Sequence, residues 1–358
     1  MLKNLIRYLT HLFRLMKKKL VFIGNYGNRN IGDDAILHVL SRRYQKKFPD
    51  YKQYVFARYY PNDIRRISIA TPLDLSLKSI FWVLCNCDVI VIGGGGIFSG
   101  YTGPKAKFIP FLGIVSKILG KKVIYESIGL YSTADYFQRY SVLLSMLLAD
   151  EISVRDIASL QSVIPIMKLK KIKLVADPGY SIRPISIKQV KEILRKEDIK
   201  ISNHKVIGIS VKRGKNNTTN AKIIFELVKV INWIVAKRNY TVLLIPFCND
   251  RIQYTEKDLE FSLEILSKIK KQSCIFCLKN YYTPQEIAGV LKLCDVFVGM
   301  RYHSLVFAYT LGIPLIPISY EEKCMDFVKK HHYPYIEADS FTYKDINVEI
   351  KNFLDINE

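Results

Sequence analysis

The sequence predicts an α/β protein made of two successive domains, each with a mostly parallel sheet. Three observations favour this fold. Short β-branched and apolar runs, typical of buried strands, alternate with longer helical patterns along most of the chain. This alternation indicates βαβ units, which form parallel sheets with helices on their faces. The same pattern starts again near residue 205, and 358 residues exceed the usual size of one domain.

The first 19 residues, MLKNLIRYLTHLFRLMKKK, predict a basic amphipathic helix. Its apolar side chains fall on one helical face, and its basic side chains lie largely off that face. The segment is too charged for the apolar core of a signal peptide and lacks a small-residue cleavage site. Two interpretations stay open: a helix in the interface of an anionic membrane, and an ordinary surface helix packed on the domain.

The N-terminal domain is expected over residues 20–185, on what we interpret as the acceptor side of the molecule. A buried strand opens it, followed by a glycine-rich loop and a helix over 33–46. The expected strands of this domain are 20–24, 53–57, 88–96, 122–129, 151–156 and 173–180. Residues 186–204 are basic and helix-like at their centre, and we expect them to link the two domains.

The C-terminal domain is expected over residues 205–335, on the donor side, and a tail over 336–358 ends in a helix. Its expected strands are 205–211, 240–247, 274–278, 295–299 and 314–319, with helices over 221–237, 256–270, 284–293 and 303–311. Two Rossmann-like domains in sequence predict a cleft between them. That architecture is similar to the glycosyltransferase B fold.

Composition restricts the classes of partner. Hydrophobic content of 49% with 24% charged residues is ordinary for a globular protein, and no apolar run reaches the roughly 18 residues of a transmembrane helix. The net charge of +22 suits nucleic acid, an anionic membrane or anionic small substrates. No nucleic-acid-binding motif is present, so nucleic acid is not an expected partner.

The seven cysteines fit buried, reduced thiols of a cytosolic protein, because their number is odd and they lie mostly in apolar runs. Cys274 and Cys277 have CxxC spacing but no second pair nearby, so no metal site is predicted.

The most informative stretch is DVFVGMRYHSLVFAYTLGIPLIPISYEEK, residues 295–323. A strand ends just before Arg301 and His303, and the next strand ends at Ser319, Tyr320 and Lys323. In open α/β sheets ligands bind beyond the carboxyl ends of strands. The three cationic groups therefore suit a small substrate with several negative charges. The alternative is that the histidine is only a satisfied structural group.

The loop after the first strand is a second candidate site. Gly32 allows close backbone approach there, and Asn30 or Asp33 can cap the following helix. A helix N-terminus attracts anions, but Asp33 and Asp34 would repel one. Sugar hydroxyls fit this loop better.

Two further stretches of the N-terminal domain are candidates for substrate binding. Gly94, Gly95 and Gly96 follow a strand but lack the spacing of a dinucleotide-binding motif, so they form either a ligand loop or a tight turn. Arg155 stands at another strand end beside Asp156, where it either faces the cleft or forms a structural ion pair.

These motifs together resemble the polysaccharide pyruvyl transferase family. The resemblance is carried by GNYGNRNIGDDAIL, VIGGGGIF, SVRDIAS and above all GMRYHSLVFAYTLGIPLIPISYEEK, in the family's order over about residues 20–330. It implies transfer of a pyruvyl group from phosphoenolpyruvate to a sugar of a cell-surface polysaccharide, usually as a cyclic ketal. The acceptor would be a glycan or a lipid-linked oligosaccharide precursor, and exopolysaccharide biosynthesis at the cell envelope would be the setting.

The residues suggest a mechanism for that reaction. His303 would protonate the methylene carbon of the donor, since an imidazole exchanges protons near neutral pH. Arg301 and Lys323 would stabilise the departing phosphate, and Asp33 or Asp34 would accept a sugar hydroxyl proton. No cofactor or metal is needed beyond the donor. The protein would act in the cytoplasm, at or near the inner face of the cell membrane.

Two other functions compete with this hypothesis. A glycosyltransferase of the same fold would use a nucleotide sugar and hold its hydroxyls with acids such as Glu321 or Glu322. A non-catalytic basic protein would bind membrane or nucleic acid through dispersed charge and would tolerate changes at His303.

Overall fold

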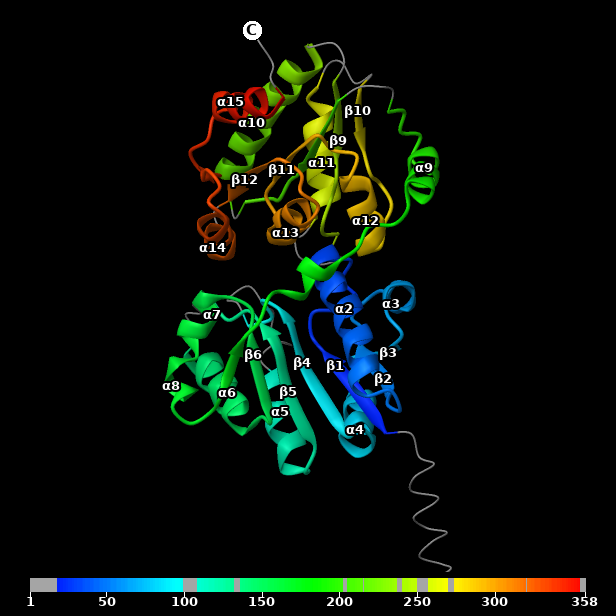
Figure 1. The fold of residues 1–358 in the computed structure, drawn as a ribbon, viewed down its shortest axis with the longest axis vertical. Coiled ribbons are helices and arrows are strands. Elements are labelled where there is room, and N and C mark those ends of the chain that lie inside the picture. Colours follow the sequence, from blue (N-terminus) through cyan, green and yellow to red (C-terminus); the bar gives the residue numbers. More distant parts are fainter. Residues whose placement is uncertain are drawn as a thin grey trace, which may run out of the picture. The chain divides into compact units, whose positions relative to one another are not determined.

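The computed structural model describes residues 18–98, 108–131, 136–201, 205–214, 216–236, 240–249, 257–269, 274–319 and 321–354. The chain forms two compact units. The first contains residues 1–27 and 37–177, and the second contains residues 28–36 and 178–358. Figure 1 labels their helices and strands.

The described part of the first unit contains a parallel sheet in the order β3-β2-β1-β4-β5-β6-β7. Its strands are apolar along most of their length because helices cover both faces of a parallel sheet. The strands are β1 (Lys19–Ile23), β2 (Lys52–Phe56), β3 (Thr71–Leu73), β4 (Val89–Gly95), β5 (Lys122–Ile128), β6 (Glu151–Val154) and β7 (Ile172–Leu174).

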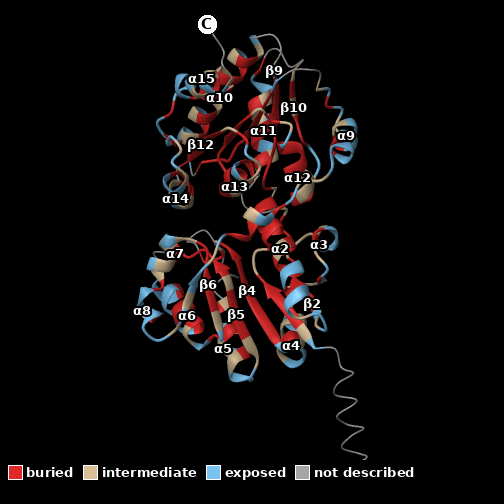
Figure 2. Cartoon of the chain, viewed as in Figure 1, coloured by how far each residue is buried: buried red, intermediate tan, exposed pale blue. Residues whose placement is uncertain are grey.

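The helices around this sheet begin at recognisable signals. Ser76 caps α4 and Asp156 caps α7, each by accepting a hydrogen bond from a backbone N–H of the first turn. The helices are α2 (Ile31–Lys47), α3 (Pro61–Ile67), α4 (Leu77–Asn86), α5 (Ile109–Ile118), α6 (Tyr136–Leu148), α7 (Ile157–Ser162) and α8 (Ile164–Met167). Figure 2 shows the strands of this sheet largely buried, whereas several helices carry exposed segments.

The second unit contains a parallel sheet in the order β10-β9-β8-β11-β12-β13 among its described residues. Its strands are β8 (Lys205–Ser210), β9 (Tyr240–Leu244), β10 (Ile275–Cys277), β11 (Val296–Gly299), β12 (Leu315–Ser319) and β13 (Ile336–Glu337). Its helices are η2 (Pro178–Ser181), α9 (Ile187–Lys196), α10 (Asn217–Ala236), α11 (Asp258–Ser267), α12 (Pro284–Leu291), α13 (Tyr302–Thr310), α14 (Glu322–His331) and α15 (Tyr343–Leu354).

Apolar clusters cover the two faces of the second sheet. Val206 and Leu243 belong to one cluster, while their chain neighbours Ile207 and Val242 belong to the other. This alternation follows from the two-residue period of a strand, which sends successive side chains to opposite faces. The core of the unit is therefore built from both faces of the sheet.

The units divide the chain differently from the ranges expected above. Residues 28–36 group with the second unit because Ile31 and Ala35 join its core and the Ile31 N–H donates to the Phe247 carbonyl at 2.9 Å. The expected linker holds α9, which begins with a capping box at Ser186 and buries Val190 in the same core. The division between the units falls at residues 177 and 178.

The expected tail also belongs to the second unit. Strand β13 pairs with β12 in the sheet, and Ile346 and Ile350 of α15 lie in the core cluster that contains α10 residues. All seven cysteines are free thiols. No helix of the described ranges is long and apolar enough to cross a bilayer, and the described residues contain no group of three metal-ligating side chains.

Candidate functional site

Three neighbouring strands of the second unit end at one edge of the sheet. Gly299, at the end of β11, is in register with Ser210 of β8 and Pro317 of β12. A Cβ on Gly299 would lie 2.6 Å from Leu305, so this glycine allows α13 to pack directly after the strand. The residues that follow β8, β11 and β12 are therefore brought together, as parallel topology requires.

A buried carboxylate organises the cations at this edge. Lys212, which follows β8, donates to Glu321, and the Lys323 ammonium lies 3.2 Å from the other Glu321 oxygen. Burial alone would raise the pKa of Glu321. The charges of Lys323, Lys212 and Arg301 outweigh burial and hold that pKa well below its usual range. Glu321 is thus an ionised group that positions two lysines.

Arg301 is fixed by a second buried carboxylate. Its Nε donates to the Asp258 Oδ2 at 2.9 Å, and its Nη2 donates to Oδ1 of the same side chain. Asp258 is fully buried at the start of α11 and also accepts from the Cys248 N–H at 2.9 Å. One edge of the Arg301 guanidinium, expected from the sequence to grip a substrate, therefore binds a protein carboxylate.

His303 lies against the start of α2. A Cβ built on Gly32 would be only 1.9 Å from the His303 Nδ1, so the imidazole occupies the space that any larger residue at position 32 would need. The Tyr302 ring meets the same imidazole edge to face at 5.1 Å between centroids. Residues 32 and 303 are far apart in sequence and form one packed contact within the second unit.

The acidic loop residues lie in this unit as well. The Asn30 Oδ1 accepts from the Gly32 N–H at 3.1 Å, so Asn30 caps α2, one of the two caps expected from the sequence. Asp33 and Asp34 are buried, and the Tyr281 hydroxyl donates to Asp34 at 2.7 Å. The sequence analysis assigned these residues to the N-terminal domain, whereas the structure groups them with His303.

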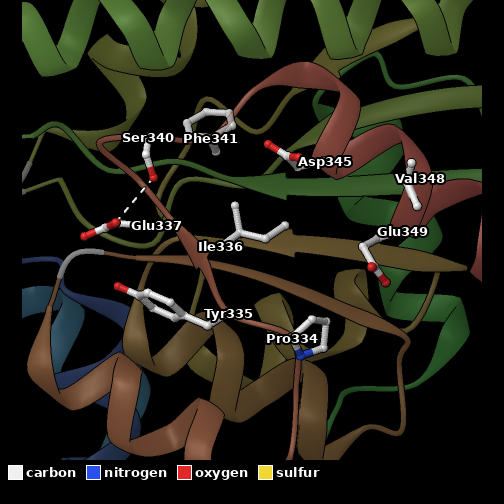
Figure 3. Close-up of a pocket in the computed structure, with 9 residues that line it drawn as sticks. All are labelled: Pro334, Tyr335, Ile336, Glu337, Ser340, Phe341, Asp345, Val348 and Glu349. Carbon is white, nitrogen blue, oxygen red and sulfur yellow. Dashed lines mark hydrogen bonds between the residues drawn. The ribbon is translucent and has the colours of Figure 1, made fainter.

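Strand β12 connects this edge to a nearby cavity. Ser319 is buried, and its hydroxyl accepts from the Glu321 N–H at 3.0 Å. The Ser319 carbonyl accepts from Tyr335, which lines a cavity of about 530 Å³ between β13 and α15 (Figure 3). Its lining includes the carboxylates Glu337, Asp345 and Glu349, so it does not suit an anionic donor. Tyr320, also expected in the site, lies outside the described residues.

In the first unit the glycine run ends β4. Gly94 and Gly95 adopt left-handed backbone angles, with φ of 78° and 87°, which residues with a side chain rarely adopt. The Gly95 carbonyl accepts from the Gly129 N–H at 3.0 Å, and Gly96 follows in the loop. These glycines are therefore needed at least for the local backbone shape.

Arg155 forms a buried network in the first unit. Its Nη1 donates to Asp177 at 2.9 Å, its Nη2 donates to the Tyr131 hydroxyl at 2.9 Å, and its Nε lies 3.3 Å from Asp156. Both Arg155 and Asp177 are almost fully buried. This geometry favours the structural ion pair, the second of the two roles that the sequence left open.

Comparison with known proteins identifies the family. The model of the polysaccharide pyruvyl transferases matches residues 30–322. This chain belongs to the polysaccharide pyruvyl transferase family. The matched range begins at Asn30 and takes in Gly32, Arg301, His303 and Glu321, and it ends one residue before Lys323.

Individual relatives are distant. The amylovoran biosynthesis protein AmsJ of Erwinia amylovora is 21% identical over 273 residues, which are 74% of this chain and 64% of AmsJ. This pyruvyl transferase family member thus matches less than two thirds of that relative's length.

Solved structures show the fold. The ADP-heptose heptosyltransferase II of Escherichia coli has a TM-score of 0.56 at 13% identity, covering 94% of this chain and 98% of its own. The UDP-GlcNAc 2-epimerase of Methanocaldococcus jannaschii has a TM-score of 0.63 at 12% identity, covering 95% and 93%. The prediction of a glycosyltransferase B-like fold with two parallel sheets is confirmed.

Two residues of this site were not predicted from the sequence. Lys212 stands two residues beyond a strand, as Arg301 does, and that spacing was the signal that could have identified it. Asp258 stands at the start of a helix, and no local pattern indicates that it faces Arg301. In this pyruvyl transferase family member the cationic site therefore contains carboxylates as well as cations.

Proposed function

We propose that the protein transfers a pyruvyl group from phosphoenolpyruvate to a sugar of a cell-surface polysaccharide or of its lipid-linked precursor, forming a cyclic ketal. The observation that carries this proposal is the cluster of Lys212, Arg301 and Lys323 at the strand ends of a polysaccharide pyruvyl transferase family member, with His303 two residues after Arg301. Phosphoenolpyruvate carries a phosphate and a carboxylate on a three-carbon frame, which a compact cationic cluster suits.

The lysines can bind the donor without leaving Glu321. An ammonium has three N–H donors, and Glu321 takes up only part of this capacity while it orients Lys212 and Lys323. The phosphate would take donors from these lysines. Arg301, held by Asp258, would contribute a fixed positive charge beside the reacting carbon.

His303 is the proposed acid. It protonates the methylene carbon of the donor, and a sugar hydroxyl then attacks the carbon that bears the phosphate. Phosphate leaves, and a second hydroxyl of the sugar closes the ketal, so one donor and one diol yield one ketal and one phosphate. The reaction is redox-neutral, and we propose that it needs no resident cofactor.

Asp33 is the proposed base for the sugar hydroxyl. It lies next to Gly32, which contacts the His303 ring, so the acid and the base belong to one packed cluster. Asp34 accepts a hydrogen bond from Tyr281 and would hold the loop. Asn30 orients the same turn by capping α2.

The decisive experiment measures phosphate release from phosphoenolpyruvate with and without a surface-glycan precursor. Release should require the precursor. The His303→Asn protein should bind the donor normally but turn over roughly 10²-fold more slowly, the usual scale of acid and base catalysis. Full activity of His303→Asn, or release that does not depend on the precursor, would contradict the proposal.

We also propose that the reaction takes place in the cytoplasm, at the inner face of the membrane, where lipid-linked precursors are anchored. Residues 1–19, with their basic amphipathic pattern, would contribute a peripheral contact with anionic lipid. Residues 1–17 lie outside the described part of the structure.

A further inference from the structure

Helices α5 and α6 of the first unit present large apolar side chains to the outside. Phe108 is 71% exposed, Ile118 76%, Phe137 64% and Tyr140 69%. Single exposed apolar residues are normal on protein surfaces, but a contiguous group of this size marks an interaction site. The apolar face, as we call it, consists of Phe108, Phe111, Val115, Ile118, Leu119, Tyr136, Phe137, Tyr140, Leu144 and Leu148.

The two helices form one continuous surface. The rings of Phe111 in α5 and Phe137 in α6 lie 6.0 Å apart between centroids. On their inner sides the helices are also apolar, where Val142 and Met146 of α6 are fully buried in the core of the unit. A helix that is apolar on both sides is normally covered on both sides. We therefore expect a binding partner to cover the apolar face.

The charged residues in and near α5 and α6 indicate the kind of partner. Neither α5 nor α6 contains an acidic residue, and α6 carries an exposed Arg139 among its aromatic residues. Helix α8, which contacts α6, leads into a segment that contains the exposed residues Lys168, Leu169 and Lys171. Aromatic and aliphatic side chains mixed with basic ones are typical of surfaces that lie in the interface of an anionic bilayer.

The start of the described chain also lies near the end of α5. The Lys19 N–H donates to the Asp88 side chain at 2.7 Å, and the Asp88 carbonyl accepts from the Lys122 N–H at 3.0 Å. Lys122 opens β5, directly after α5. The described chain thus begins at the end of the sheet where α5 leads into β5.

We propose that the apolar face of α5 and α6 is a membrane-docking surface that inserts into the interface of an anionic lipid bilayer. A second copy of this chain is the less favourable occupant, because a symmetric contact would bring two basic faces together. The N-terminal segment is basic as well, so it complements anionic lipid and not this face. The proposal concerns a surface other than the pyruvyl transfer site and does not depend on the chemistry there.

Vesicle cosedimentation of the full chain tests the proposal. The triple variant Phe111→Ser, Phe137→Ser and Tyr140→Ser should bind vesicles of phosphatidylcholine with 30% phosphatidylglycerol at least about tenfold more weakly than the parent. The reason is that membrane affinity depends on the apolar area buried in the bilayer and on attraction to anionic lipid. A matched control carries Phe225→Ser, Leu263→Ser and Val348→Ser, which remove exposed apolar side chains of the second unit. It should bind like the parent.

Two further measurements separate the alternatives. Arg139→Glu with Lys171→Glu should weaken binding to the anionic vesicles and leave the weak binding to pure phosphatidylcholine unchanged. The triple variant should keep the parent melting temperature, because the replaced side chains are exposed, and should still release phosphate with a water-soluble acceptor. Parent-like vesicle binding by the triple variant would overturn the proposal. A parent dimer that the triple variant converts to a monomer in analytical ultracentrifugation would assign the face to a second copy.

Discussion

Replacing Gly32 by alanine would place a methyl group in the space that the His303 ring occupies. The new Cβ would lie 1.9 Å from Nδ1, and ordinary van der Waals contact begins at 3.4 Å, so the imidazole must move by about 1.5 Å. A misplacement of about 1 Å can cost 10²-fold in rate. We therefore expect Gly32→Ala to lower kcat by roughly 10²-fold while KM for phosphoenolpyruvate changes little, because the lysines do not move.

Stability provides the control for this substitution. Alanine in the first turn of a helix is favourable, but overpacking costs about 1–3 kcal/mol, so the protein should stay folded with a modest loss of stability. Gly120→Ala is the matched variant: its φ of 75° strains an alanine, while a Cβ there meets nothing within 4 Å. It should lose stability and keep its rate. A Gly32→Ala protein with parental kcat would refute the inference that the His303 position matters for turnover.

Three further predictions follow from the charged groups. Glu321→Gln should cost about 3–5 kcal/mol, since two lysines lose a buried partner. The pKa of Glu321 is lower in the folded chain than in the unfolded chain, so the ionised side chain stabilises the protein at pH values above the unfolded pKa, and this stabilisation is lost as pH falls through the folded pKa. In denaturant titrations, the free energy of unfolding should therefore differ less between pH 7 and pH 3 for Glu321→Gln than for the parent. Arg301→Lys should lower stability as well as donor affinity, because a lysine cannot donate to both oxygens of Asp258 in the way the guanidinium does. A melting curve measures this loss, and a parental Tm would contradict the prediction. Phosphoenolpyruvate should raise Tm more than UDP at equal concentration, and the reverse order would favour a nucleotide-sugar donor.

The strand ends could be predicted from the sequence because their signals are local. The run Val296–Gly299 has the composition of a buried strand, and parallel topology then places Arg301 and Lys323 at one edge. The helix start after Asn30 follows from capping chemistry in the same way. These features depend on residues within a few positions of one another, so the sequence contains enough information to place them.

The partners of these groups could not be predicted, because they depend on contacts between distant segments. The contact between Gly32 and His303 joins residues 271 positions apart, and it exists because residues 28–36 pack on the second unit. The pairing of Asp258 with Arg301 joins the start of α11 to the residue just before α13, 43 positions further along the chain. Neither pattern nor charge along the chain specifies such a contact, so the sequence indicated Arg301 and Lys323 but neither Lys212 nor Asp258.

Those carboxylates bear on the choice of ligand. Lys212, Arg301 and Lys323 carry three positive charges, and Asp258 with the ionised Glu321 carries two negative charges, so the cluster is nearly neutral before any ligand binds. A cluster without carboxylates would bind inorganic phosphate, the proposed product, almost as well as the donor. With Glu321 in place an anion must share the lysines with a resident carboxylate, and a ligand with two anionic groups on a compact frame gains more from this arrangement than a single phosphate does. If phosphoenolpyruvate is the donor, as we propose, the buried carboxylates favour its binding over retention of phosphate.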